Sequence, residues 1–306
     1  MHLEALVPAT TSNLGPGFDA VGMALQLCNR FEVQVVDDPR SAGTEVCGLG
    51  ANELQGRQDT PFHVGLRHAA AALGRPLPPL RVLLDNAVPM GSGLGSSSTA
   101  ICGGLLLGRL ICGGDDDREA LLQQAAALEG HPDNAAPCLL GGLVVACQDG
   151  ATTAALRLPM PAALCCVAVT PALSLSTALM RAALPAQLPL ADVVAQGVHA
   201  TLLGAALALG RLDLLALATR DRLHESVRGA HIPGFLAARA AGLAAGALAV
   251  PISGAGPTLI ALCDGDSACA GVGAAMVAAF EQSGIGAQAR TLRPRAEGIV
   301  WRKITP

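Results

Sequence analysis

The chain has 306 residues, a net charge of −4 and an apolar share of 51%, enough for one large domain or two ordinary domains with buried cores. Aromatic residues are scarce, with five Phe, one Trp and no Tyr, and no block of Lys or Arg occurs. Single-stranded nucleic acid needs aromatic stacking platforms and duplexes need a basic surface, so the composition argues against both functions.

The sequence favours a soluble protein with reduced thiols. The N-terminal residues 1–4 lack the basic stretch and apolar core of a signal peptide. One uncharged window, 240–263, has the length of a membrane span, but Pro251, Pro257 and several glycines interrupt it. The ten cysteines show no CxxC spacing and lie mostly in apolar surroundings. We therefore expect a cytoplasmic protein whose cysteines belong to the core.

The predicted elements alternate between helix and strand. In chain order they are a strand over 80–84, helices over 97–110 and 118–128, strands over 142–147 and 164–170, helices over 193–209, 212–223, 235–248 and 267–282, and an edge strand over 286–292. This mixed order indicates an α+β protein rather than a doubly wound parallel sheet. Prolines cluster in 151–161, so we place a boundary there, between domains 1–157 and 158–306.

Three stretches break this regular pattern and read as functional loops. They are VPATTSNLGPGFDAVG at 7–22, PMGSGLGSSSTA at 89–100 and ISGAGPT at 252–258, and each follows an apolar segment. In the second stretch, alternating glycines let the backbone fold tightly, and serines then begin an apolar helix. A helix start carries free N–H groups and partial positive charge, so it attracts phosphate. The alternative is a flexible turn with an ordinary helix cap. No Lys follows as in a Walker A loop, and the spacing is not that of a dinucleotide fingerprint.

A bound Mg²⁺-nucleotide also needs a carboxylate. Glu129 is the candidate, because it opens the cluster EGHPDN at 129–134, which gathers Glu, His, Asp and Asn before an apolar segment. Taken alone, this cluster slightly favours a helix end followed by a solvated turn. Because the chain also carries a predicted phosphate-binding loop, we interpret the 129–134 cluster as part of the nucleotide site.

In this order and spacing, the three stretches resemble the motifs of the GHMP kinases (galactokinase, homoserine kinase, mevalonate kinase and phosphomevalonate kinase). The resemblance runs from Val7 to Thr258 and covers most of the chain. It implies an N-terminal domain that is ribosomal protein S5 domain 2-like, a ferredoxin-like C-terminal domain and substrates in the cleft between them. The segments SNLGPGFD and EGHPDNAAPCLLGG most resemble the branch that phosphorylates L-homoserine with ATP to O-phospho-L-homoserine, in threonine biosynthesis.

The resemblance also implies roles for individual residues. The ATP phosphates would lie on Pro89, Met90, Gly91, Ser92, Gly93, Leu94, Gly95, Ser96, Ser97 and Ser98. Mg²⁺ would be held by Ser97 and Glu129. The substrate would contact Asn13, Asp19, His131, Asp133, Asn134, Thr177, Arg181 and Arg228. Within this set, Arg181 and Arg228 would hold the carboxylate with planar, two-pronged hydrogen bonds, and Asp19 would hold the ammonium.

The catalytic group predicted from the motifs is Asn134, Asp133 and Glu129. In mevalonate kinase relatives the aspartate matching Asp133 is a candidate base, usually paired with a lysine, but the only lysine in this chain is Lys303. We therefore expect Asp133 to orient the substrate, because phosphoryl transfer depends mainly on positioning and charge neutralisation.

Other interpretations remain open at this stage. The arginines could be surface charges, Asp19 a helix cap and His131 a plain loop residue. The chain could also be a mevalonate- or sugar-type GHMP kinase, against which Asp19 speaks, or a non-catalytic GHMP-fold ligand sensor, against which the intact Ser97, Glu129 and Asn134 speak. Phe62-His63-Val64 stands where related enzymes often carry Asn-Leu-Val near adenine. Exposed Ala/Leu faces leave a homodimer open.

Overall fold

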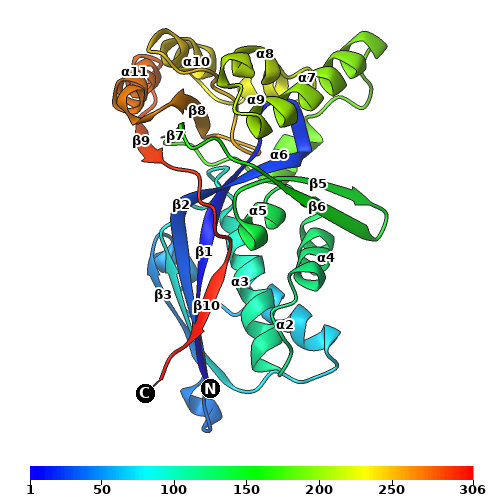
Figure 1. Ribbon diagram of the computed structural model, residues 1–306. Coiled ribbons are helices and arrows are strands. Elements are labelled where there is room, and N and C mark those ends of the chain that lie inside the picture. Colours follow the sequence, from blue (N-terminus) through cyan, green and yellow to red (C-terminus); the bar gives the residue numbers. More distant parts are fainter. Residues whose placement is uncertain (306) are drawn as a thin grey trace.

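The computed structural model describes residues 1–305 and contains two sheets, one above the other in Figure 1, with both termini at the lower end. The strands are β1 (His2–Asn13), β2 (Gly17–Val35), β3 (Gly43–Gly48), β4 (Leu80–Asn86), β5 (Leu143–Asp149), β6 (Thr152–Leu158), β7 (Leu164–Pro171), β8 (Leu259–Asp264), β9 (Ala287–Leu292) and β10 (Val300–Lys303). The helices are α1 (Ala51–Leu54), α2 (Pro61–Ala72), α3 (Ser96–Ile111), α4 (Arg118–Glu129), α5 (Ala135–Leu140), α6 (Thr177–Ala182), α7 (Leu190–Ala208), α8 (Leu215–Ala218), α9 (Glu225–Gly229), α10 (Phe235–Ala244) and α11 (Cys269–Gln282).

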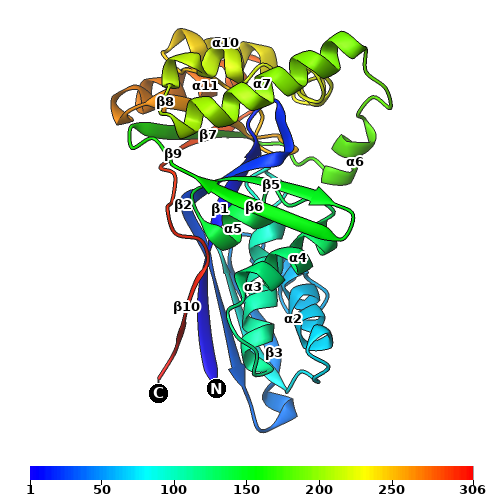
Figure 2. The ribbon, with the colours of Figure 1, turned by 45° about the vertical axis from the view of Figure 1, so that its right-hand side comes forward.

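The lower sheet has seven strands in the order β10-β1-β2-β4-β3, with β5 pairing with β2 and β6 pairing with β5. Only β3 and β4 run parallel in this sheet, across the described residues. Helices α2 to α4 lie on one side of the long strands, as the two views in Figures 1 and 2 show. Their core packs Phe31 of β2 against Phe62 of α2, with ring centroids 5.0 Å apart.

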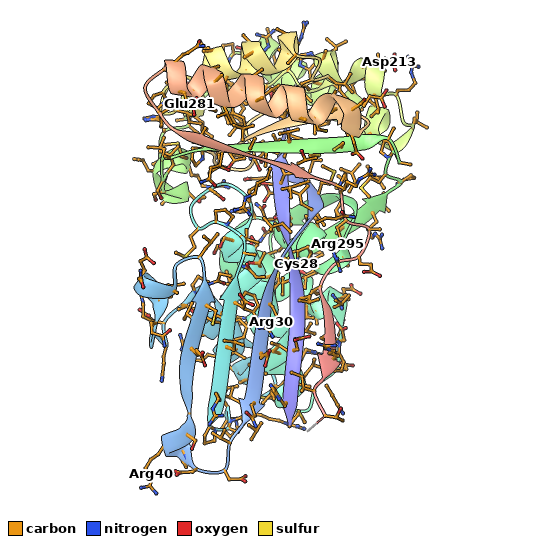
Figure 3. All side chains as sticks on the ribbon, turned by 90° about the vertical axis from the view of Figure 1, so that its left-hand side faces the viewer. Cys28, Arg30, Arg40, Asp213, Glu281 and Arg295 are labelled. Atoms are coloured by element: carbon orange, nitrogen blue, oxygen red, sulfur yellow. The ribbon has the colours of Figure 1, made fainter. Side chains whose placement is uncertain are left out.

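The upper sheet has three strands in the order β8-β7-β9, all antiparallel, and helices α7 to α11 cover it. Figure 3 shows this helical layer above the sheet. Strand β7 is buried on both sides: Cys165, Val167 and Val169 enter one core, while Cys166 and Ala168 enter another. This explains its unbroken apolar sequence, because a strand covered on both faces does not alternate with polar residues.

The two parts share one continuous core. Leu14, Met23 and Leu94 from the first part pack with Cys166 and Ile260 from the second. The chain changes sheet between Leu158 and Leu164, and β10 returns to pair with β1. The predicted division at 157/158 stays a prediction. The expected α+β fold class is confirmed, and the shared core fixes the two parts on either side of the site.

Three expectations from the sequence are wrong. Residues 7–22 are not a loop but the facing ends of β1 and β2 with a short turn between them. Their polar side chains concealed the strands, since Thr10, Thr11 and Ser12 are buried with polar partners. The helix expected over 212–223 stops at Ala218, and the helix expected over 235–248 stops at Ala244.

Each early stop has a local cause. The Asp221 carboxylate accepts hydrogen bonds from the backbone N–H groups of Leu223, His224 and Glu225, at 3.0, 2.6 and 2.7 Å. The Asp221 carboxylate therefore caps the beginning of a new helix, α9, and α8 does not extend to this point. Beyond α10, Gly246 has a φ of 102°, a left-handed backbone that cannot continue a right-handed helix.

Candidate active site

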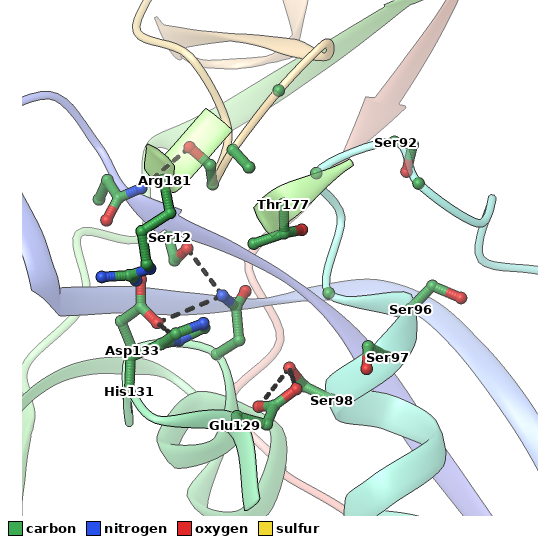
Figure 4. A pocket seen from close by; sticks show the side chains of 18 of the residues that line it. Ser12, Ser92, Ser96, Ser97, Ser98, Glu129, His131, Asp133, Thr177 and Arg181 are labelled. Carbon is green, nitrogen blue, oxygen red and sulfur yellow. Dashed lines mark hydrogen bonds and ion pairs between the residues drawn. The ribbon is translucent and has the colours of Figure 1, made fainter. Parts of the chain in front are cut away.

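A cavity of about 330 Å³ lies where the two parts meet, and it is lined by all three sequence stretches. Every predicted site residue lines this cavity except Pro89, Met90 and Leu94. The Pro89 carbonyl accepts a hydrogen bond from Ser92, Met90 lines a neighbouring cavity, and Leu94 is buried in the shared core. Figure 4 shows how serines from α3, the 129–134 cluster and the α6 side chains converge on the cavity.

The glycine loop joins β4 to α3 in a backbone shape that requires glycine. Gly91, Gly93 and Gly95 have φ values of 61°, 87° and 71°, in the left-handed region. A Cβ at Gly93 would lie 2.2 Å from the Ser253 carbonyl oxygen. The Ser253 hydroxyl also donates to the Gly93 carbonyl at 2.7 Å. The 252–258 stretch therefore packs directly against the loop and fixes its shape.

Helix α3 offers a free N-terminus to this cavity. It begins after Gly95, and no side chain caps its first turn. Ser96, Ser97 and Ser98 line the cavity, so the unpaired N–H groups of this turn and the positive end of the helix dipole are available to an anion. This is the arrangement expected of a phosphate site.

Glu129, the last residue of α4, faces the same helix end. The Ser98 hydroxyl contacts both Glu129 carboxylate oxygens, at 2.8 and 2.7 Å. No cationic side chain in residues 1–305 forms an ion pair with this carboxylate. Glu129 is half-buried at the cavity wall. Removal of the carboxylate from bulk water raises the pKa of Glu129 to about 7, although the hydrogen bonds from Ser98 act in the opposite direction. A cation bound here would supply the positive charge that no side chain of the described residues places beside the Glu129 carboxylate.

The residues after Glu129 form a connected polar network. The Asn134 carbonyl oxygen accepts from the Thr10 hydroxyl at 2.8 Å, and its amide donates to Ser12 at 2.9 Å. The His131 ring nitrogen lies 2.7 Å from the Asp133 carboxylate. Burial lowers the pKa of His131, but its contact with Asp133 outweighs this effect and raises the pKa above its usual value. The network therefore holds Asp133 and Asn134 in fixed orientations.

Two predicted substrate residues already pair with each other. Arg181 of α6 donates two hydrogen bonds to the Asp19 carboxylate, each 2.8 Å long. Asn13 and Asp19 have φ values of 67° and 56°, and the Asp19 N–H donates to the Asn13 side chain at 3.0 Å. A non-glycine residue in this region costs about 1–3 kcal/mol, and such strain gathers at functional sites.

Arg228 is fully buried beside this pair. It donates to the Gly254 carbonyl at 2.9 Å, and its Nε has no partner in the described structure. Burial lowers the pKa of Arg228, and Arg181 lowers it further. His224 lies 3.3 Å from Arg228 through Nδ1 and 2.9 Å from the Gly15 carbonyl through Nε2. The neutral ring with its proton on Nε2 satisfies both contacts, and burial lowers the pKa of His224 accordingly.

The structure adds residues that the sequence did not single out. The Phe18 ring contacts both arginines, with guanidinium carbons 5.4 Å (Arg181) and 5.1 Å (Arg228) from its centroid. His224 flanks it at 5.3 Å. For Glu129 the contacting hydroxyl is that of Ser98, so the role of Ser97 stays a prediction. Phe18 lies inside the SNLGPGFD segment, and His224 lies in the stretch 221–224 just before Arg228, which resembles the late substrate segment of the family; these were the available signals.

Two further features border the main cavity. The ligand atoms of Asp19, His131 and Asp133 all lie within 4.8 Å of one another, a grouping that could hold a cation. A mostly apolar cavity of about 180 Å³ opens beside the glycine loop and shares Gly91, Ser96 and Ser97 with the main cavity. Phe31, Phe62 and Met90 are among the side chains that line it, while His63 lies outside it, bound to Thr44 and Thr60.

Comparisons with known proteins agree with this geometry. The chain matches the models of the GHMP kinases N terminal domain at residues 63–142 and of the GHMP kinases C terminal region at 202–282. It is 40% identical to a homoserine kinase of Moorella thermoacetica over 294 residues, covering 96% of this chain and 98% of the relative. A homoserine kinase of Synechocystis sp. is 37% identical over 299 residues, covering 97% of each.

A solved structure is also similar over its whole length. The crystal structure of homoserine kinase from Cytophaga hutchinsonii superposes with a TM-score of 0.87 at 28% sequence identity, covering 98% of this chain and 97% of that one. The glycine loop, the free N-terminus of α3 and the nearly full-length matches all indicate the same family. The chain belongs to the GHMP kinase family, among its homoserine kinases.

Proposed function

We propose that the protein transfers the γ-phosphoryl group of ATP to the side-chain hydroxyl of L-homoserine, giving O-phospho-L-homoserine and ADP. One observation carries the proposal: a single cavity has an anion-binding helix end at one side and paired opposite charges at the other. The first suits a triphosphate, and the second suits the carboxylate and ammonium of an amino acid.

ATP fits the two adjoining cavities. The glycine loop and the first turn of α3 would bind its phosphates through backbone N–H groups. The apolar cavity lined by Phe31, Phe62 and Met90 begins at the same loop and would take the adenine ring. GHMP kinases use ATP, and this arrangement supports that cofactor for the present chain.

Mg²⁺ is proposed from the donor set at Glu129. A buried carboxylate without an ion-pair partner, beside the hydroxyls of Ser98 and Ser97, consists of the oxygen ligands that Mg²⁺ prefers. When bound, the ion would neutralise phosphate charge that develops during transfer. The protein's own contribution is to keep the carboxylate in place and ready to ionise.

L-homoserine would replace the Asp19–Arg181 ion pair with matching contacts. Its ammonium would pair with Asp19, and its carboxylate would bind Arg181 together with Arg228, whose Nε is free. Thr177 lines the same cavity, and His131 lies beside Asp19, with ligand atoms of the two side chains within 4.8 Å of each other. A ligand with only one of the two charges would leave one member of the broken pair without a partner, which favours a zwitterion.

The hydroxyl end would lie toward Asn13, Asp133 and Asn134. Asp133 accepts hydrogen bonds from its neighbours and has no lysine near it, since the only lysine is Lys303 in β10. We therefore assign Asp133 to orientation of the hydroxyl, with Asn134 fixing the same end of the substrate. Helix α3 and its loop would supply the charge stabilisation that lowers the barrier.

The test is an ADP-release assay with L-homoserine, L-serine, mevalonate and galactose as acceptors, with identification of the phosphorylated product. The proposal requires turnover with L-homoserine far above the other acceptors. Preference for mevalonate or galactose would indicate another GHMP kinase, and tight binding without turnover would indicate a ligand sensor. Either result would overturn the proposal.

A further inference from the structure

A separate cavity of about 550 Å³ lies in the upper part of the protein and shares no lining residue with the main cavity. Its walls come from α8 and the segment that follows it, from α9 and α10, and from residues 248–251. Figure 1 shows these three helices in the helical layer of the upper part. We call this space the arginine cavity, because Arg220, Arg222 and Arg239 line it. The reaction proposed above does not use it.

Two of these arginines have no partner for their side chains. Across residues 1–305, the guanidinium groups of Arg220 and Arg222 form neither an ion pair nor a hydrogen bond, and the same holds only for Arg81 and Arg290. Every other arginine side chain contacts a carboxylate, a backbone carbonyl or both. Two unpaired guanidinium groups at the wall of one cavity are suited to an anion, since each can bind carboxylate or phosphate with two hydrogen bonds.

The acidic residues of the wall do not cancel this charge. Asp221 accepts four hydrogen bonds, three of them from N–H groups at the start of α9. Glu225 is 4% exposed, pairs with Arg239 and accepts from the Ile252 N–H at 2.7 Å. Both carboxylates are therefore occupied by donors of the protein, while the two unpaired arginines are available to a ligand.

Much of the remaining wall is apolar and partly exposed. Leu236 and Leu243 of α10 are 74% and 44% exposed, and Phe235, Leu248 and Val250 also line the cavity. An inorganic ion would leave these side chains in water, whereas the body of an organic anion would cover them. The volume is in the range of cavities that hold small molecules.

We propose that the arginine cavity binds a small organic anion, a carboxylate or a phosphate ester with an apolar body, and that this ligand lowers the affinity of the main cavity for its substrate. Arg220 and Arg222 would bind the anionic group, and the leucines of α10 would cover the apolar body. The binding site stands independently, whereas the effect on the substrate rests on the proposed function.

Helix α9 connects the two cavities. Glu225 of this helix lines the arginine cavity, while Arg228 lines the main cavity. Arg228 donates to the Gly254 carbonyl at 2.9 Å. Glu225 accepts from the N–H of Ile252, which begins the segment that contains Gly254. A change at Glu225 would therefore reach the substrate contact at Arg228 through both the helix and this segment.

Arg239 is the group that a ligand would displace. It pairs with Glu225, and its Nε donates to the Val250 carbonyl at 2.9 Å. Burial raises the pKa of Glu225 and Arg239 lowers it, so the ion pair favours the charged carboxylate. An anion in the arginine cavity competes with Glu225 for Arg239. The buried carboxylate would then lose its counter-charge, and its contact with Ile252 would shift.

Titration calorimetry of the full chain with saturating ADP and Mg²⁺ tests the site, using phenyl phosphate and phenylacetate as probes. At least one of these anions should bind with a dissociation constant below about 1 mM, which identifies the ligand class. Benzyl alcohol and inorganic phosphate should bind at least about tenfold more weakly, because each lacks one of the two features. Arg220→Gln combined with Arg222→Gln should weaken the anion at least about tenfold.

The matched control is Arg81→Gln combined with Arg290→Gln, which removes the other two unpaired arginines and should bind the anion as the wild type does. Absence of binding by both anions, an equal loss in the control, or inorganic phosphate that binds as tightly would overturn the site.

Steady-state kinetics test the effect on the main cavity. The saturating anion should raise the KM for L-homoserine at least about threefold in the wild type and in the control. The variant without Arg220 and Arg222 should keep the kcat and KM of the wild type and show no response to the anion, which excludes simple competition in the main cavity. Binding that depends on these arginines without any change of KM would refute the coupling. If the anion binds there but L-homoserine is not phosphorylated, the proposed function and the effect on its substrate fail, while the site stands.

Discussion

The buried carboxylate of Glu129 allows a quantitative prediction about stability. Burial raises its pKa to about 7 from the ordinary 4.5. Between these two pH values the folded chain keeps a proton that the unfolded chain releases, so this group favours folding at low pH and the contribution is lost as pH rises through 7. One pKa unit corresponds to about 1.4 kcal/mol, so the upper limit is about 3 kcal/mol. Because the cavity admits water to the carboxylate, we expect about 1–2 kcal/mol.

Glu129→Gln removes the titration while keeping the size and a hydrogen-bond acceptor for Ser98. Urea unfolding without nucleotide and with EDTA, at pH 5 and pH 8, gives the free energy of unfolding of each form. The stability of the variant relative to that of the wild type should rise by about 1–2 kcal/mol between pH 5 and pH 8. It should lose kinase activity at both pH values. Exposed Glu45 on β3 provides the matched control, since Glu45→Gln should leave the pH dependence of the wild type unchanged.

A variant whose stability falls with pH as steeply as that of the wild type would refute the argument, because Glu129 would then not carry the excess proton. A variant whose stability relative to that of the wild type falls between pH 5 and pH 8 would refute it too. Added Mg²⁺ and ADP provide a further check in the wild type. Metal binding needs the ionised carboxylate, so their stabilising effect should be greater at pH 8 than at pH 6.

Three more substitutions test the remaining parts of the site. Gly93→Ala places a Cβ 2.2 Å from the Ser253 carbonyl, so the KM for ATP should rise at least about tenfold in steady-state assays; an unchanged KM would contradict the loop assignment. Phe18→Leu removes two ring contacts with arginines, each worth about 0.5–1 kcal/mol, and should raise the KM for L-homoserine about fivefold but not that for ATP. Asp133→Asn should lower kcat by about tenfold; complete loss of turnover with intact substrate affinity and fold would show that Asp133 is a base.

Local sequence was sufficient wherever a feature depends on neighbouring residues. The apolar run at 164–170 predicted β7 because a strand buried on both faces needs no alternation. The alternating glycines at 91–95 predicted a tight loop because left-handed backbone angles favour residues without a Cβ. The family motifs carried the list of site residues, and all of these but three line one cavity.

Tertiary structure decided the features that join distant parts of the chain. Strands β1 and β2 were hidden because Thr10, Thr11 and Ser12 find polar partners only in the folded protein. The pairing of Asp19 with Arg181 joins positions 162 residues apart, and the free Nε of Arg228 exists only because the fold buries that side chain. Residue type and spacing set which groups are available, while burial and long-range contact decide their charge, orientation and partners.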